Sequence, residues 1–119
     1  MPDPLNEFEV SAQRRNGACV VRVSGELDIS THERLGEQLS KVANGKLPIV
    51  VDLSSCDFID SSGIRALLLG VKAVEANSKG TGAFSIASPG PQVRRILEMT
   101  GVDRTVPVHG SVDEALKKL

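Results

Sequence analysis

One stretch near the middle of the chain constrains the fold more than any other. It begins with an apolar run at residues 49–53 and reaches the tetrapeptide Asp-Ser-Ser-Gly at residues 60–63, beyond which apolar residues recur at helical spacing from Ile64. A short run rich in Val and Ile predicts a buried strand, and the later spacing predicts an amphipathic helix. We therefore expect a strand, a polar break at residues 54–55, and a helix of residues 62–77 whose first turn presents hydroxyl groups at the edge of a sheet.

The predicted helix has an apolar side and a polar side. At about 100° per residue, one stripe holds Ile64, Leu67, Leu68, Val71 and Val74, and the opposite side holds Ser62, Arg65, Leu69, Lys72 and Ala76. Leu69 is therefore an apolar residue between two cations on the side that faces solvent. It is either an isolated surface leucine, which is common and which its position alone favours, or a contact for a partner protein.

The first third of the chain predicts a hairpin followed by a helix. The Asn-Gly pair at residues 16–17 lies between alternating runs at 8–14 and 18–23, and both of its positions tolerate the positive φ of a tight hairpin turn. Further on, Ser30 and Glu33 fit a capping box at the start of a helix. Because this helix separates the hairpin from the next strand, we expect that strand to pair in parallel through a right-handed crossover.

The second half of the chain continues the alternation of strands and helices. After a turn at 78–82 we expect a strand at 83–87, a helix that begins after Ser88 and is followed by Gly101, an extended segment at 106–108, and a terminal helix capped by Ser111. The chain thus predicts a flexible tail at residues 1–7 and one α/β domain at residues 8–119. Its small mixed sheet combines the N-terminal hairpin with parallel strands and packs against about four helices.

Composition excludes some classes of partner. A chain of 119 residues is most simply one domain, and it can bury a core without metals or disulfides. Three Phe residues and no Trp or Tyr leave little on which nucleic-acid bases could stack. The net charge of −1 gives no basic surface for a phosphate backbone, so we expect no nucleic-acid partner.

The cysteines and the hydropathy pattern indicate where the protein acts. Cys19, expected in a strand, and Cys56, expected in a loop, lack the spacing of metal ligands and indicate a reduced, intracellular protein. We find no signal peptide and no apolar run of transmembrane length. We therefore expect a cytoplasmic protein with no membrane partner.

No pattern of an enzyme is recognisable in the chain. His32 and His109 are isolated, and the Ser-Lys-Gly-Thr-Gly segment at residues 78–82 lacks the spacing of a phosphate-binding loop and precedes a strand instead of a helix. There is no Gly-x-Ser-x-Gly nucleophile elbow. We expect no catalytic residue, no metal site and no cofactor.

The Asp-Ser-Ser-Gly motif has a structural and a functional interpretation. Asp or Ser before an apolar helix is what a helix N-cap requires, and taken alone the motif favours the cap. As a phosphoacceptor, one of its serines would gain about −1.5 to −2 charges at a helix end whose free N–H groups and dipole favour an anion. If Asp28 and Asp60 lie together, the local field is already acidic, and the added dianion would repel a carboxylate of a docked partner. The site would then be a charge switch on binding.

These motifs resemble those of the bacterial anti-sigma factor antagonists, which belong to the STAS domain family. The resemblance covers residues 20–119 and is carried by four segments, at residues 23–28, 49–53, 58–63 and 97–103. The first and last are weak singly. The Asp-Ser-Ser-Gly after a hydrophobic strand, at this distance from the Gly-Glu-Leu-Asp of residues 25–28, is fairly specific.

The resemblance implies a mechanism. Ser61 would be phosphorylated by a partner that is both an anti-sigma factor and a serine kinase, and this partner would supply the ATP and the catalytic base. The unmodified protein would bind the kinase and free the sigma factor, phosphorylation would abolish that binding, and a serine phosphatase would restore it. Asp28 and Asp60 match acidic positions beside the acceptor, and Ser62 matches the neighbouring hydroxyl that opens the helix. Gly63 completes the neighbourhood of the phosphosite.

The resemblance also implies a docking surface on the helix that follows the motif. Its outward residues Arg65, Leu69 and Lys72 lie where such proteins meet their partners, which favours the second interpretation of Leu69. Arg65 is a departure, because many relatives carry a small residue there, and it puts the identity of the kinase in doubt.

Two other functions remain open at this point. The chain could be a non-switching STAS subunit, either a scaffold component or an accessory of a membrane transporter, because a fold does not determine a function. Direct binding of a nucleotide is a weaker alternative. The oligomeric state is left open.

Overall fold

A computed structural model describes residues 7–78 and 83–119 of the chain. Of the predicted tail only Glu7 is described, and of the predicted turn at 78–82 only Ser78; the remainder of both lies outside the described residues. In chain order the elements are β1 (Glu9–Arg15), β2 (Ala18–Leu27), α1 (His32–Ala43), β3 (Ile49–Ile59), α2 (Ser61–Ser78), β4 (Phe84–Ala87), α3 (Pro91–Met99), α4 (Val102–Thr105), β5 (Val108–His109) and α5 (Val112–Lys117).

The five strands form one mixed sheet in the order β1-β2-β3-β4-β5. β1 and β2 are antiparallel and are joined at Asn16 and Gly17, whose φ angles of 50° and 80° are those of the predicted hairpin turn. The pairs β2–β3, β3–β4 and β4–β5 are parallel. The predicted hairpin, mixed sheet and parallel pairing after the first helix are therefore confirmed.

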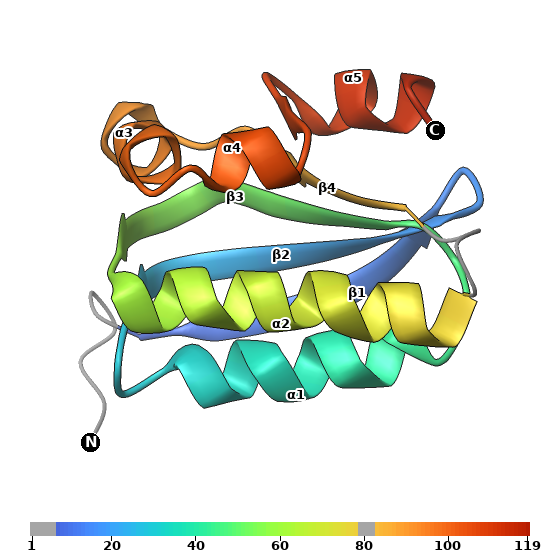
Figure 1. The fold of residues 1–119 in the computed structure, drawn as a ribbon, viewed down its shortest axis with the longest axis horizontal. Coiled ribbons are helices and arrows are strands. Elements are labelled where there is room, and N and C mark those ends of the chain that lie inside the picture. The colour runs from blue at the N-terminus through green and yellow to red at the C-terminus, as the bar shows by residue number, and fades with distance from the viewer. Residues whose placement is uncertain (1–6, 79–82) are drawn as a thin grey trace.

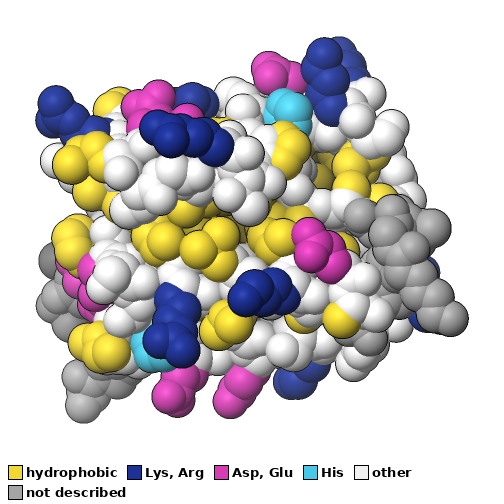
Figure 2. Space-filling model, in the orientation of Figure 1, with side chains coloured by type: hydrophobic (Ala, Val, Ile, Leu, Met, Phe, Trp, Pro, Cys, Tyr) yellow, Lys and Arg dark blue, Asp and Glu magenta, His cyan; other side chains and the backbone are white. Residues whose placement is uncertain are grey.

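Helices cover both faces of the sheet. Figure 1 shows α1 and α2 side by side on one face and α3, α4 and α5 on the other. The apolar stripes of α1 and α2 enter the main core, where Leu35, Leu39 and Leu67 are fully buried against Val21 and Val51. Figure 2 shows a further band of apolar side chains between α2 and the helices of the opposite layer. The sheet is thus the middle layer of a three-layer α/β fold.

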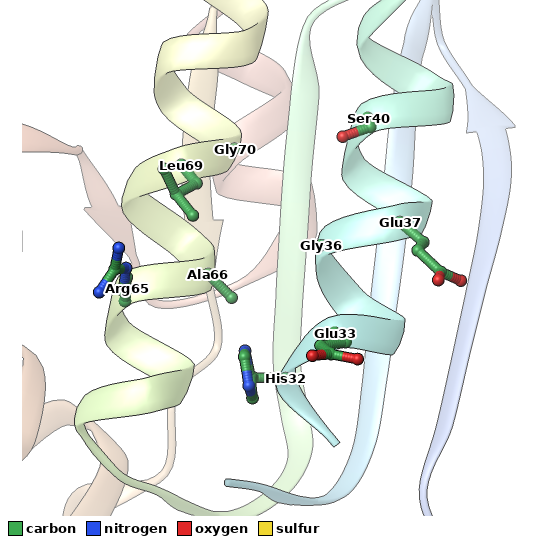
Figure 3. A pocket seen from close by; sticks show the side chains of 9 residues that line it. All are labelled: His32, Glu33, Gly36, Glu37, Ser40, Arg65, Ala66, Leu69 and Gly70. Carbon is green, nitrogen blue, oxygen red and sulfur yellow. The ribbon is translucent and has the colours of Figure 1, made fainter. Parts of the chain in front are cut away.

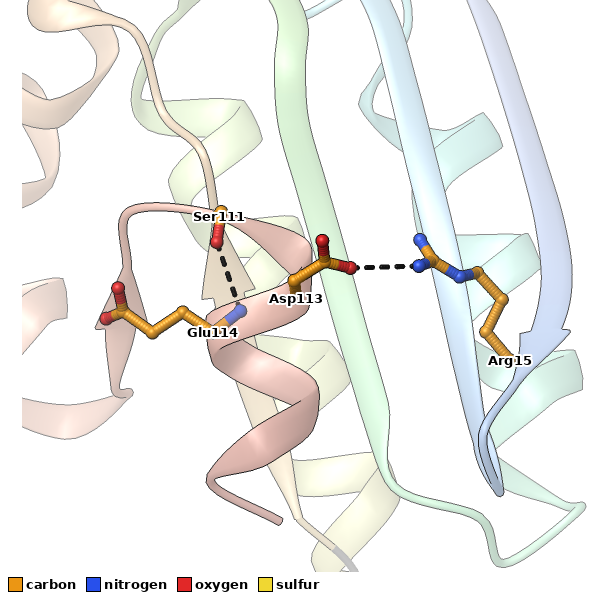
Figure 4. Close-up of polar contacts among 4 residues, drawn as sticks. All are labelled: Arg15, Ser111, Asp113 and Glu114. Carbon is orange, nitrogen blue, oxygen red and sulfur yellow. Dashed lines mark hydrogen bonds and ion pairs between the residues drawn. The ribbon is translucent and has the colours of Figure 1, made fainter.

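The short helix α5 packs on one face of the sheet, where its Ala115 is buried with Val20 and Val50 (Figure 4). The Ser111 hydroxyl accepts a hydrogen bond from the Glu114 N–H at 3.0 Å, which confirms Ser111 as the predicted cap. The Glu114 carboxylate pairs with the His109 side chain at 3.4 Å. The Arg15 guanidinium of β1 forms an ion pair with the Asp113 carboxylate at 3.0 Å. These contacts join the last helix to β1 and to β5, the two edge strands of the sheet.

Strand β3 is longer than predicted. It continues through residues 54–55 to Ile59, so the predicted polar break is wrong, and Cys56 is a buried strand residue instead of a loop residue. The register with β2 shifts twice along this part of the strand. Here the strand carries polar side chains on an open face, where the Arg22 guanidinium donates to Ser55 Oγ at 2.7 Å.

One helix prediction needs correction. Ser30 does not cap α1, which begins at His32 after Thr31, and the Ser30 hydroxyl donates to Asp28 instead. The predicted helices are all present among the described residues, and the four-residue helix α4, which follows Gly101 directly, is a short addition to them. Gly101 has a φ of 78°, which ends α3 and lets the chain start a second helix at once.

Candidate functional site

The predicted phosphoacceptor lies where β2 and β3 end together. Leu27, the last residue of β2, is the register partner of Ile59, the last residue of β3. The Asp60 N–H donates to the Leu27 carbonyl at 3.2 Å, which holds the start of α2 against the end of β2. Asp28 and Asp60 follow these paired residues, so the two acidic positions lie side by side at the carboxyl edge of the parallel strands. This is the arrangement on which the interpretation of the motif as a charge switch depends.

Asp60 is the N-cap of α2. Its Oδ1 atom accepts hydrogen bonds from the Ser62 N–H at 2.8 Å and the Gly63 N–H at 3.1 Å. The expectation that these N–H groups are free for a phosphate is therefore wrong, because the carboxylate already occupies them. Ser61, the first residue of the helix, is exposed, whereas Ser62 is half-buried. A group added to Ser61 would therefore extend into solvent.

The Asp28 carboxylate is held in the loop between β2 and α1. Its Oδ1 accepts from the Ser30 hydroxyl at 2.7 Å and from the Ser30 N–H at 2.9 Å, and Thr31 Oγ1 accepts from the Asp28 N–H at 2.9 Å. The bond from the Ser30 hydroxyl is the main reason why the pKa of Asp28 is lower than usual. Asp28 therefore contributes a fixed negative charge beside Asp60.

Gly63 lets the first turn of α2 approach the ends of both strands closely. A Cβ atom at this position would lie 2.8 Å from the Leu27 carbonyl oxygen, 2.8 Å from Leu27 Cγ and 2.8 Å from Ile59 Cγ1. Only a residue without a side chain fits here without displacing the backbone. Gly63 therefore fixes how far Ser61 stands from the sheet.

The outward face of α2 brings Ser61 and the predicted docking residues together. Arg65, Leu69 and Lys72 are all exposed, and Leu69 exposes 53% of its surface. At about 100° per residue, Ser61 and these three residues fall within one side of the helix. A partner that docks on this side of α2 would lie directly over the Ser61 hydroxyl.

A groove between α1 and α2 continues this surface (Figure 3). It has a volume of about 390 Å³ and is lined by His32, Glu33, Gly36, Glu37, Ser40, Arg65, Ala66, Leu69 and Gly70. The two helices approach closely at Gly70, where a Cβ atom would lie 2.6 Å from Leu39 Cδ1. The sequence did not predict the α1 wall of this groove. Gly70 in the middle of α2 was the available signal for close helix packing.

The other residues considered in the sequence do not join the site. Burial raises the pKa of the Cys56 thiol to about 11, which makes this cysteine unreactive at neutral pH. His109 is bound to Glu114 near α5. Among the described residues, no helix has the length and apolar character that crossing a bilayer requires.

Replacing Gly63 tests its role in positioning α2. We expect Gly63→Ala to lower the free energy of unfolding by about 1–3 kcal/mol, because the new methyl group would overlap the Leu27 carbonyl. Urea denaturation followed by circular dichroism measures the change. Gly36→Ala is the matched control: its Cβ meets no atom within 4 Å, so it should stabilise helix α1 by about 0.5–1 kcal/mol. Equal stability changes at the two glycines would contradict this role for Gly63.

The lowered pKa of Asp28 predicts a pH-dependent contribution to stability. The charged carboxylate stabilises the folded state above its unfolded pKa of about 3.9, and this contribution is lost as the pH falls through the lower folded pKa. Asp28→Asn should therefore be destabilising at pH 7 and should approach the wild type in strongly acidic buffer. Denaturant titrations at several pH values test this, with the exposed Asp57→Asn as the control. A pH-independent difference between wild type and Asp28→Asn would refute it.

Comparisons with known proteins agree with this geometry. The model of the STAS domain family matches residues 9–115. The anti-sigma F factor antagonist of Paenibacillus polymyxa is 30% identical over 114 residues, which cover 94% of this chain and 95% of that protein. The anti-sigma-F factor antagonist RsfB of Mycobacterium tuberculosis is 28% identical over 116 residues, which cover 97% of this chain and 89% of that protein.

A solved structure supports the same assignment. The crystal structure of an anti-sigma factor antagonist from Mycobacterium paratuberculosis superposes with a TM-score of 0.86 at 31% identity, covering 99% of this chain and 97% of that one. The resemblance seen in the sequence is thereby confirmed, together with the fold that it implied. From the span of the family match and the similarity over nearly the whole length of these relatives, we conclude that the chain belongs to the STAS domain family.

Proposed function

We propose that this protein is an anti-sigma factor antagonist that is switched by phosphorylation of Ser61. The unmodified form binds an anti-sigma factor that is also a serine kinase, and so releases a sigma factor in the cytoplasm. The observation that carries the proposal is the exposure of Ser61 on the same side of α2 as Arg65, Leu69 and Lys72. The relatives described above are anti-sigma F factor antagonists, which supports an anti-sigma factor as the partner.

The physical basis of the switch is charge at an interface. A phosphate on Ser61 would add about −1.5 to −2 charges beside the carboxylates of Asp28 and Asp60. Because Asp60 already occupies the N–H groups of Ser62 and Gly63, the phosphate would extend outward toward the partner. Like charges brought together at an interface cost several kcal/mol. Binding would weaken while the fold stays intact, since Ser61 is exposed and contributes nothing to the core.

The chain needs to supply only two things in this mechanism. It offers an acceptor hydroxyl and a docking surface, whereas the kinase supplies ATP and the catalytic base. A serine phosphatase would hydrolyse the phosphoserine and return the protein to its binding form. In this role the protein is a regulated binding partner and requires no cofactor or metal of its own.

Substitution of Ser61 tests the proposal. Incubation with ATP and each candidate anti-sigma factor kinase, read by intact mass and peptide mapping, should add one phosphate to the wild type and to Ser62→Ala. Ser61→Ala should gain none and still bind the kinase, because removal of one exposed hydroxyl leaves the docking surface in place. Ser61→Asp should bind about tenfold or more weakly, as measured by titration calorimetry. Equal labelling of Ser61→Ala would overturn the proposal.

Two further measurements separate the alternatives. Copurification with a transport subunit, without phosphoserine in the intact mass, would favour a non-switching scaffold or transporter accessory. Heat released on titrating the isolated protein with ATP or GTP would favour direct nucleotide binding.

A further inference from the structure

We propose that the groove between α1 and α2 receives an amphipathic helix of the partner, with one bulky apolar side chain inserted between the two helices. This inference rests on the proposed function, since it identifies the element of the anti-sigma factor that docks beside Ser61. It extends the docking surface from α2, where the sequence pointed, to the outward side of α1. The partner helix would carry acidic residues on the flank that faces α2 and basic residues on the flank that faces α1.

The floor of the groove is built for an inserted side chain. Gly36, Ala66 and Gly70 are small, and a Cβ atom at Gly36 would meet no atom within 4 Å. Figure 3 shows Ala66, Leu69 and His32 directed toward the gap between the helices. Leu69 is one of the most exposed large apolar residues among those that the structure describes. A helix that lays apolar residues into a groove of this kind is a recurrent mode of recognition.

The rims of the groove carry opposite charges. Glu33 and Glu37 are exposed on α1, and Arg65 is exposed on α2. Figure 3 shows Arg65 and Glu37 directed away from the gap on opposite sides. Within the described part of the chain, none of these three residues forms an ion pair, so all three charges are available to a partner. Charge complementarity of this kind determines orientation and partner choice.

This arrangement connects the groove to the switch. Arg65 lies four residues after Ser61, so the two side chains are neighbours on the surface of α2. The acidic flank that Arg65 attracts is therefore the part of the partner closest to a phosphate on Ser61. The same flank would be attracted before phosphorylation and repelled after it.

Filling the groove tests the proposal. The measurement is titration calorimetry with the kinase that phosphorylates Ser61. Gly36→Leu should weaken binding about tenfold or more, because the new side chain occupies the space of the inserted one. Its melting temperature should not fall, because leucine is a better helix former than glycine. Glu98→Leu is the control, since it adds the same side chain to an exposed site on α3, on the other face of the sheet.

Reversal of one charge on the rim of the groove tests the proposal independently. Glu37→Lys should weaken binding several-fold, whereas Glu98→Lys should leave it unchanged. Unchanged affinity of both Gly36→Leu and Glu37→Lys for a kinase that still labels Ser61 would overturn the groove and leave the proposed function standing. Dimerisation of the wild type in sedimentation velocity that Gly36→Leu abolishes would also overturn it, because the groove would then bind a second copy of this chain.

If no kinase labels Ser61 and the proposed function itself fails, a peptide probe still tests whether the groove binds an amphipathic helix. The probe is a stapled helix with a central Phe, Glu residues on one flank and Lys residues on the other, titrated into ¹⁵N-labelled protein. The amides of Gly36 and Gly70 should shift, and Gly36→Leu should suppress the binding. Shifts confined to other surfaces, or no shift at millimolar peptide, would overturn the groove.

Discussion

The contact between the first turn of α2 and the ends of β2 and β3 positions everything else at the candidate site. Asp60 is held from two directions: its N–H donates to the Leu27 carbonyl, and its carboxylate accepts from the N–H groups of Ser62 and Gly63. Gly63 lies so close to Leu27 and Ile59 that a side chain would not fit. Ser61 stands between the cap and this glycine, and its exposed hydroxyl is therefore presented from a well-defined backbone.

The same helix serves the core and the surface. Its inner side buries Leu67 and Val74, and Gly70 lets α1 pack closely against it. The outer side is left with exposed charges and with Leu69. Because the inner side anchors α2 to the sheet, a change of charge on the outer side can alter binding without a change of fold. This separation is the physical reason why a phosphate on Ser61 would weaken binding of a partner without unfolding the domain.

Sequence patterns predicted the elements best where short-range chemistry decides them. The hairpin turn at Asn16 and Gly17 follows from backbone preferences of two residues, and the two sides of α2 follow from helical periodicity. The patterns failed where a tertiary partner changes the local preference. Residues 54–55 remain in β3 because the strand continues its pairing with β2, where Ser24 is the register partner of Ser55. Ser30 turns to the Asp28 carboxylate instead of capping α1.

The sequence by itself determined the alternation of strands and helices, the Asp-Ser-Ser-Gly motif at the start of α2, and the set of residues on the outward side of that helix. Only the tertiary structure decided that Asp28 lies beside Asp60 and that α1 supplies the second wall of the groove. The first group depends on residues close together along the chain, whose spacing is visible in the sequence. The second depends on strand register and on helix–helix packing, which join segments far apart in the chain and arise only when the core forms.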